Sequence, residues 1–307
     1  MGKIAFMFSG QGAQKAGMGR DFYDSLPLVR ELFDYCDVVR PGTLDQCFNG
    51  TDEVLKDTAN TQPCLYLADI AAAIAAKEAG IKPDALAGFS LGEIPALAFG
   101  GAYSYESGFR IAASRGCIMG KEASKTQASM MAVVKLPDEK VEELCSKYDD
   151  VYPVNYNAPG QLTVAGREDQ LESLKADVKT AGGRGIPLNV SGGFHSPFMD
   201  GASRKFGAYL ENVEMQSPNM RVFSDYTGDI YAPDENGVKQ LLEKQINSPV
   251  RWSKIIMSLA AAGYDTFIET GVGNVLKNLA GKMLPDAKTF SIQTMEDVEN
   301  AVKELGL

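Results

Sequence analysis

Residues 84–98 read DALAGFSLGEIPALA, and this stretch decides the fold. A short apolar run at 84–89 leads into the pattern G-x-S-x-G at 88–92, and a helix-forming run follows at 93–98. A serine between a strand and a helix sits in a strained turn, which closes because small residues flank it and which turns the hydroxyl outward. The stretch therefore predicts a nucleophilic serine, Ser90, at the end of a buried strand.

The segments around this turn alternate between strand and helix. An apolar run at 3–8 predicts a buried strand that ends in a glycine turn at 10–12. A long Ala, Leu and Ile stretch at 63–79 predicts a helix that Gly80 stops, and 105–122 predicts another helix. Because such alternation is typical of parallel sheets covered by helices, we expect an α/β fold.

The middle of the chain has a different order of elements. The predicted order is strand, helix, strand, strand, helix, strand, at 129–134, 138–147, 151–156, 161–165, 168–181 and 184–190. This order is that of a ferredoxin-like unit. The chain then returns to helix, strand and helix at 255–263, 266–269 and 275–283. We therefore expect a small ferredoxin-like domain at 126–196, inserted into a large parallel-sheet domain formed by 1–125 and 197–307.

The composition limits the classes of protein. Of the 307 residues, 45% are hydrophobic and 23% are charged, as in globular proteins. The net charge of −10 argues against a nucleic-acid binder, because affinity for phosphate backbones comes from clustered Lys and Arg. No stretch is apolar enough to span a bilayer, and the start lacks the apolar region of a signal peptide. We expect a cytoplasmic protein, without membrane association, and a monomer.

The five cysteines are scattered along the chain, at 36, 47, 64, 117 and 145. Their spacing fits neither a disulfide framework nor a zinc site, so we expect reduced thiols and no metal. The turn at 10–12 does not belong to a nucleotide loop, because the pattern G-x-G-x-x-G fails at Lys15. We therefore expect no cofactor.

A serine nucleophile needs a base within hydrogen-bond reach, and the chain has a single histidine, His195. It follows the last strand of the inserted unit, which would place it at a cleft between the two domains. A lone histidine is more often packed or exposed than catalytic, but its pairing with the serine turn favours a base. Hydrolases of the α/β class carry their histidine near the chain end, so an ordinary esterase is disfavoured. Spacing does not show what orients the ring, and Asp200 and Asp225 are nominal candidates.

Two further features suggest how a substrate would be held. The turn at 10–12 would supply a main-chain N–H to an oxyanion hole, or it is a plain tight turn. Arg110 and Arg115 lie about 140° apart around one predicted helix, so at most one of them faces the serine. An arginine there would select a substrate with a free carboxylate by a bidentate contact. Periodicity does not choose between the two, and a solvated helix face is the alternative for each.

Six blocks of sequence, taken in order, resemble the malonyl-CoA:acyl-carrier-protein transacylase family, which shares them with the acyltransferase domains of polyketide synthases. The blocks are GQGAQ at 10–14, GFSLGE at 88–93, RG at 115–116, NYNAPGQ at 155–161, GFHSP at 193–197 and SPVRW at 248–252. They span nearly the whole chain, and six blocks in one order are far more specific than any one of them.

The resemblance implies a hydrolase-like large domain with a ferredoxin-like insert. It implies that Ser90 is the nucleophile, that His195 is its base, and that the main-chain N–H groups of Gln11 and Leu91 form the oxyanion hole.

The resemblance also implies roles that the residues alone left open. Arg115 matches the carboxylate-binding arginine of the family, and Gln245 matches the glutamine whose main-chain carbonyl orients the histidine. Phe194, directly before the histidine, is similar to the arrangement in malonyl-selective members, so malonyl is favoured over methylmalonyl. The chain departs from the family at Phe89, where His is usual, and at Ser9, where Pro is usual. We expect activity to survive, because that usual histidine is not the base.

The activity implied by the resemblance is transfer of a malonyl group from malonyl-CoA to the pantetheine thiol of acyl carrier protein, in fatty-acid biosynthesis, with ping-pong kinetics. The alternatives are a discrete acyltransferase of the polyketide-synthase type, an acyl-thioester hydrolase and a catalytically idle binding subunit. Four basic residues are candidates for contact with an acidic carrier, with a solvated face as the alternative: Lys179, Arg184, Arg204 and Lys205.

Overall fold

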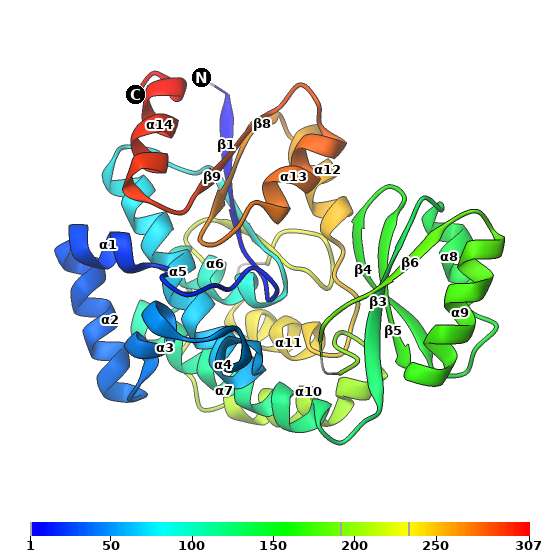
Figure 1. The fold of residues 1–307 in the computed structure, drawn as a ribbon. Coiled ribbons are helices and arrows are strands. Elements are labelled where there is room, and N and C mark those ends of the chain that lie inside the picture. The colour runs from blue at the N-terminus through cyan, green and yellow to red at the C-terminus, as the bar shows by residue number, and fades with distance from the viewer. Residues whose placement is uncertain (1, 191, 233) are drawn as a thin grey trace.

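A five-stranded parallel sheet lies at the centre of the larger part of the molecule (Figure 1). The computed structural model describes residues 2–190, 192–232 and 234–307. The strand order is β7-β2-β1-β8-β9, and every pairing is parallel. The strands are β1 (Lys3–Phe8), β2 (Ala85–Gly88), β7 (Arg221–Phe223), β8 (Tyr264–Thr270) and β9 (Lys288–Ile292).

The position of β1 in this order locates the site. The chain passes from β1 to β2 on one side, and later to β8 on the other side. The loops that follow β1 and β2 therefore leave the same edge of the sheet, the edge at which open α/β sheets bind ligands.

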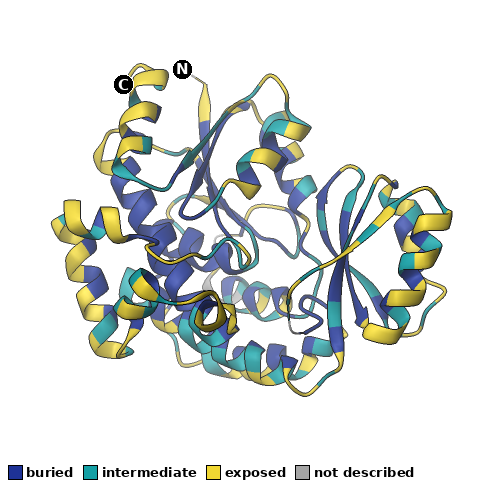
Figure 2. Cartoon of the chain, in the orientation of Figure 1, coloured by how far each residue is buried: buried dark blue, intermediate teal, exposed yellow. Residues whose placement is uncertain are grey.

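Helices pack on both faces of the sheet, because successive residues of the central strand point to opposite faces. Phe6 joins the core that contains α5 (Thr58–Glu78), whereas Met7 joins the core that contains α12 (Trp252–Ala261). Figure 2 shows that the central strands and α5 are largely buried and that the outer helices carry the exposed residues. The predicted α/β fold with a parallel sheet is confirmed.

The remaining helices of this part surround the sheet. They are α1 (Arg20–Ser25), α2 (Pro27–Val39), α3 (Thr43–Asn49), α4 (Asp52–Lys56), α6 (Glu93–Phe99), α7 (Tyr105–Ala123), α10 (Asp200–Leu210), α11 (Glu235–Gln245), α13 (Val275–Met283) and α14 (Met295–Leu305), with short 3₁₀ turns η1 (Ser90–Gly92) and η2 (Pro197–Met199).

The middle of the chain folds into a second sheet, which stands beside the first in Figure 1. Its strand order is β4-β5-β3-β6, and all of its pairings are antiparallel. Its elements are β3 (Ala128–Val134), α8 (Asp138–Cys145), β4 (Val151–Ala158), β5 (Gln161–Arg167), α9 (Glu168–Thr180) and β6 (Arg184–Pro187). This is the order of elements predicted for a ferredoxin-like unit. The domain limits 126–196 stay a prediction.

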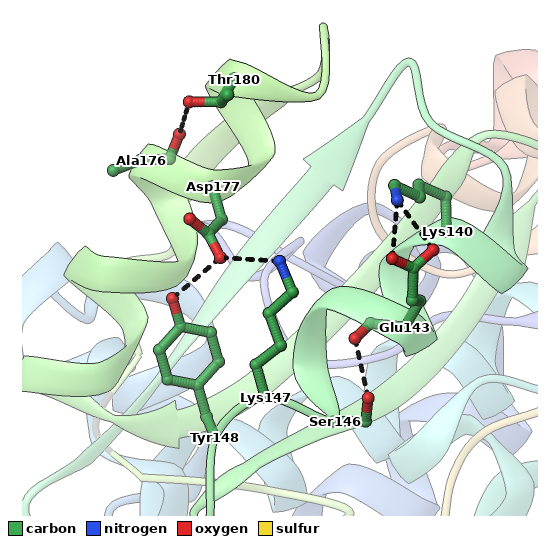
Figure 3. Close-up of polar contacts among 8 residues, drawn as sticks. All are labelled: Lys140, Glu143, Ser146, Lys147, Tyr148, Ala176, Asp177 and Thr180. Carbon is green, nitrogen blue, oxygen red and sulfur yellow. Dashed lines mark hydrogen bonds and ion pairs between the residues drawn. The ribbon is translucent and has the colours of Figure 1, made fainter.

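The two helices of this unit are held mainly by their apolar faces. Val141 and Leu174 belong to a core shared with the strands. On the outer surface, Asp177 accepts hydrogen bonds from Lys147 and Tyr148, each at 3.3 Å (Figure 3). Exposed contacts of this kind contribute only about 0–1 kcal/mol each, so the core stabilises the helices.

Several boundaries differ from the predicted ones. The helix expected at 63–79 begins at Thr58, because the Asp57 side chain accepts the Ala59 N–H and caps the helix earlier. The strand expected at 184–190 ends at Pro187. The structure also contains elements that the sequence pattern did not predict, namely α1 to α4, α10, α11, α14, β7 and β9.

None of the helices in the described ranges has the length and apolar character needed to cross a membrane. The five cysteines are free thiols.

Candidate active site

The serine turn closes only because two glycines flank it. A Cβ atom at Gly88 would lie 2.0 Å from the main-chain carbon of Gly92. A Cβ atom at Gly92 would lie 2.2 Å from the Phe8 carbonyl oxygen. Between them, Ser90 has a φ of 54°, in the left-handed region that non-glycine residues rarely adopt. The chain therefore holds the Ser90 hydroxyl on a strained turn between β2 and α6.

His195 contacts this hydroxyl from the segment that follows β6. Ser90 Oγ lies 2.7 Å from His195 Nε2, and His195 Nδ1 lies 2.9 Å from the Gln245 carbonyl oxygen. A carbonyl oxygen only accepts, so Nδ1 carries the ring proton and Nε2 accepts the Ser90 O–H. His195 also has a positive φ, of 61°.

The nominal carboxylate candidates do not orient the ring. Asp200 accepts a hydrogen bond from Asn247 at 2.8 Å, and Asp225 accepts the Ser90 main-chain N–H at 2.6 Å. The ring nitrogen is held by the neutral carbonyl of Gln245 instead.

The imidazole is buried, with 3% of its residue surface exposed. Burial lowers the pKa of His195 to about 4, and the nearby Arg115 charge acts in the same direction. The ring is therefore neutral at pH 7, which is the form that accepts a proton from serine.

Arg115 is the arginine that faces the serine. Its Nη2 donates to Ser90 Oγ at 3.2 Å and to Gln245 Oε1 at 2.7 Å, and its Nη1 donates to Gln62 Oε1 at 3.0 Å. Arg110, in contrast, is exposed and contacts Tyr35 on the outer surface. Burial lowers the pKa of Arg115 to about 10, so its guanidinium stays charged at neutral pH.

Two buried carboxyl groups complete the site. The sequence motifs assigned no role to Glu93, and the sequence offered Asp225 only as a nominal candidate for orienting His195. Glu93 Oε2 accepts the Gln245 side-chain amide at 2.7 Å, and Asp225 Oδ2 accepts the same amide at 3.2 Å. Burial raises the pKa of Glu93 to about 7, and it raises the pKa of Asp225 well above its usual range. The sequence does contain a signal for Glu93, because it is the single charged residue of an otherwise apolar helix, EIPALAF, and a charged residue in such a helix indicates a buried acid.

The turn after β1 lies against the serine turn. A Cβ atom at Gly10 would lie 2.7 Å from the Phe89 carbonyl oxygen, so glycine permits this approach. Within the described ranges, the Gln11 main-chain N–H has no hydrogen-bond partner. Leu91, the other predicted N–H donor, follows the serine in η1 and is buried. The structure thus brings the two predicted oxyanion donors onto adjacent turns.

Ser9 and Phe89, the two residues that depart from the family pattern, each contact a neighbouring side chain. Ser9 Oγ donates to the buried Asp69 at 2.7 Å. The Phe89 ring packs edge-on against Trp252, with 5.6 Å between the ring centroids.

A cleft of about 850 Å³ opens between the two sheets beside these turns. Gln11 and Phe89 line it from the large sheet, and Asn155, Gln161 and Leu188 line it from the small unit. In the described residues, no group of three or more His, Cys, Asp or Glu side chains is arranged to hold a metal ion. The four basic candidates for carrier contact are all exposed: Lys179, Arg184, Arg204 and Lys205. The Lys205 side chain forms an ion pair with Glu122 at 3.1 Å.

Comparison with known proteins places the chain in a family. The sequence profile of the acyl transferase domain matches residues 5–295. The malonyl CoA-acyl carrier protein transacylase of Bacillus subtilis (strain 168) is 35% identical over 311 residues, which cover 99% of this chain and 98% of that protein.

Solved structures give the same result. The malonyl CoA-acyl carrier protein transacylase of Clostridium perfringens superposes with a TM-score of 0.95 at 31% identity, over 99% of this chain and 97% of that one. A malonyl-transacylase in complex with a type II polyketide synthase acyl-carrier protein superposes with a TM-score of 0.93 at 28% identity, over 98% of this chain and 99% of that one. The chain therefore belongs to the acyl transferase family, in the group that contains the malonyl CoA-acyl carrier protein transacylases.

Proposed function

We propose that the chain transfers a malonyl group from malonyl-CoA to the pantetheine thiol of acyl carrier protein, in fatty-acid biosynthesis, through an acyl-enzyme on Ser90. The observation that carries the proposal is the buried, charged Arg115 guanidinium, 3.2 Å from the nucleophile oxygen. A fixed positive charge at that distance suits an acyl group with its own carboxylate. The names of the relatives support the same substrates.

In the first half-reaction, Ser90 Oγ attacks the thioester carbonyl carbon and His195 Nε2 takes the hydroxyl proton. The resulting imidazolium keeps its Nδ1–H bond to the Gln245 carbonyl, which is 2.9 Å away. The main-chain N–H groups of Gln11 and Leu91 stabilise the oxyanion of the tetrahedral intermediate. The intermediate collapses when the C–S bond breaks and His195 returns the proton to the departing CoA sulfur.

The second half-reaction reverses this path with a new thiol. The pantetheine thiol of the carrier gives its proton to His195, and its sulfur attacks the malonyl ester. The ester C–O bond breaks, and Ser90 recovers the proton from the imidazolium. Because both half-reactions use one site, ping-pong kinetics are expected.

Arg115 has a donor that its neighbours leave unused. Its Nε is buried and has no hydrogen-bond partner among the described residues. An incoming carboxylate supplies an acceptor for this donor and a counter-charge for the guanidinium. An acetyl group supplies neither, so we infer selectivity for malonyl.

A carrier of polyketide synthesis is a second candidate partner. One structural neighbour at 28% identity was solved with a type II polyketide synthase carrier, and the chemistry at Ser90 would be the same. Parallel assays with a fatty-acid carrier and a polyketide carrier distinguish the two. The monomeric state and the cytoplasmic location stay predictions.

The transfer itself is tested by incubating the protein with malonyl-CoA and a carrier that bears its pantetheine arm. We expect malonyl-carrier to accumulate, with little free malonate whether or not the carrier is present. Rapid release of free malonate without transfer would instead identify a thioester hydrolase.

A further inference from the structure

We propose that Glu93 is a positioning residue, which fixes the orientation of the Gln245 side-chain amide and, through it, the direction of the Arg115 guanidinium. The proposal rests on the malonyl transfer proposed above. It concerns the side chain of Gln245, which is separate from the main-chain carbonyl that holds His195.

The amide nitrogen of Gln245 faces three oxygen atoms. It lies 2.6 Å from the Ser90 carbonyl oxygen, 2.7 Å from Glu93 Oε2 and 3.2 Å from Asp225 Oδ2. If the amide turned over, its oxygen would face the Ser90 carbonyl oxygen, which only accepts, and its nitrogen would lose the contacts with both carboxyl groups. The surroundings of the amide therefore fix its orientation.

The fixed amide presents its oxygen to Arg115. Gln245 Oε1 accepts the Nη2 hydrogen bond at 2.7 Å, while Gln62 accepts the Nη1 hydrogen bond at 3.0 Å. Both terminal nitrogens of the guanidinium are therefore held by amide oxygens, and the plane of the group is set. The hydrogen bond of Nη2 depends on the orientation of the Gln245 amide.

Glu93 is placed for this role by the fold itself. It opens α6, two residues beyond Leu91, and none of its surface is exposed. Its other oxygen accepts from the Tyr231 hydroxyl and, at 3.3 Å, from the Asp225 main-chain N–H. Burying a carboxyl group without hydrogen bonds is costly, and here each oxygen has a donor.

The consequence concerns selectivity more than general catalysis. Glu93 contacts neither Ser90 Oγ nor His195, so its replacement leaves the nucleophile and base contacts in place. In Glu93→Gln, the new amide can present its nitrogen to Gln245, so the Gln245 amide loses one of its three acceptors and is fixed less firmly. The hydrogen bond from Arg115 Nη2 to Gln245 Oε1 is then weakened, so the guanidinium is less well oriented for the malonyl carboxylate.

The experiment compares kcat/KM for malonyl-CoA and for acetyl-CoA in two variants. Glu93→Gln replaces the carboxyl group that accepts from the Gln245 amide, and Tyr231→Phe removes only the hydroxyl on the other side of Glu93. We expect the malonyl to acetyl ratio to fall roughly tenfold in Glu93→Gln, with a raised KM for malonyl-CoA. In Tyr231→Phe the ratio should stay within about twofold of wild type.

A third variant covers the case in which Glu93→Gln does not fold. Gln245→Met removes the amide and keeps the main-chain carbonyl, and it should lower the same ratio. Equal losses with both substrates, or the same fall in Tyr231→Phe, would overturn the proposal. A wild-type protein that transfers no malonyl would instead refute the proposed function, so the two failures are distinguishable.

Discussion

Arg115 Nη2 donates a hydrogen bond to Ser90 Oγ at 3.2 Å. The two residues come from different elements, α7 and the turn after β2, and the contact sets a buried positive charge beside the nucleophile. The charge has two consequences. It lowers the pKa of His195, and it provides a counter-ion for an acyl group that carries a carboxylate.

Replacement of the guanidinium tests its role in substrate choice. In Arg115→Met, kcat/KM for malonyl-CoA should fall roughly 10- to 100-fold, because hydrogen bonds to charged groups contribute about 1.5–3 kcal/mol. The value for acetyl-CoA should fall much less. Arg110→Met, on the exposed face of the same helix, serves as the matched control and should leave both values unchanged. Equal losses for the two substrates in Arg115→Met would contradict a carboxylate contact.

The pH dependence follows from the lowered pKa of the base. A histidine accepts a proton only when it is neutral, and the His195 pKa of about 4 keeps it neutral above that pH. The acid limb of kcat/KM should therefore lie near pH 4 rather than near pH 6.5.

The chain has one histidine, so NMR of tag-free protein can follow His195 alone. Its ring should titrate near pH 4, and its pKa should rise in Arg115→Met because one of the two lowering causes is lost. Titration of the wild-type ring at pH 6 or above would contradict the buried, neutral base.

The glycine beside the serine should tolerate no side chain. In Gly92→Ala, the new methyl group would lie 2.2 Å from the Phe8 carbonyl oxygen, so β1 or the turn has to move. We expect a loss of several kcal/mol in the free energy of unfolding, together with loss of acylation.

Gly80→Ala is the matched control for this loss. Gly80 has a φ of 94° with nothing within 4 Å of the new methyl group, so only backbone strain of about 1–2 kcal/mol is added. Thermal unfolding measures both variants, and equal losses would argue that crowding at Gly92 is unimportant.

The Phe89 side chain should matter for packing rather than for chemistry. It contacts Trp252 edge-on, an arrangement that contributes about 0.5–1.5 kcal/mol beyond buried area. Phe89→His should therefore lower the free energy of unfolding by about 1 kcal/mol. Its kcat for malonyl transfer should stay within about threefold of wild type, because the ring lies outside the hydrogen bonds of Ser90 and His195. A loss of a hundredfold or more would show that this position takes part in the reaction.

Part of the site was predictable from local chemistry. The turn around Ser90 requires glycine at positions 88 and 92, because backbone atoms lie where a side chain would be. The glycine pattern of the sequence therefore predicts this turn. Strand and helix alternation and the order of the inserted elements were likewise readable as patterns.

Other parts depend on contacts between distant segments. His195 is oriented by a main-chain carbonyl, and every residue has one, so no residue type points to Gln245. Only the resemblance singled out this position. Asp225 accepts the Ser90 main-chain N–H although the two residues are 135 positions apart in the sequence. Residue spacing does not predict a hydrogen bond between segments so far apart. Short elements such as β7, with three residues, carry too little periodicity to be placed.

The most direct test of the central claim is the intact mass of the protein after mixing with malonyl-CoA. Wild type should gain the mass of one malonyl group and lose it when the pantetheine-bearing carrier is added. Ser90→Ala should gain nothing. A Ser90→Ala protein that carries the same adduct, or a wild type that never becomes labelled, would contradict an acyl-enzyme on Ser90.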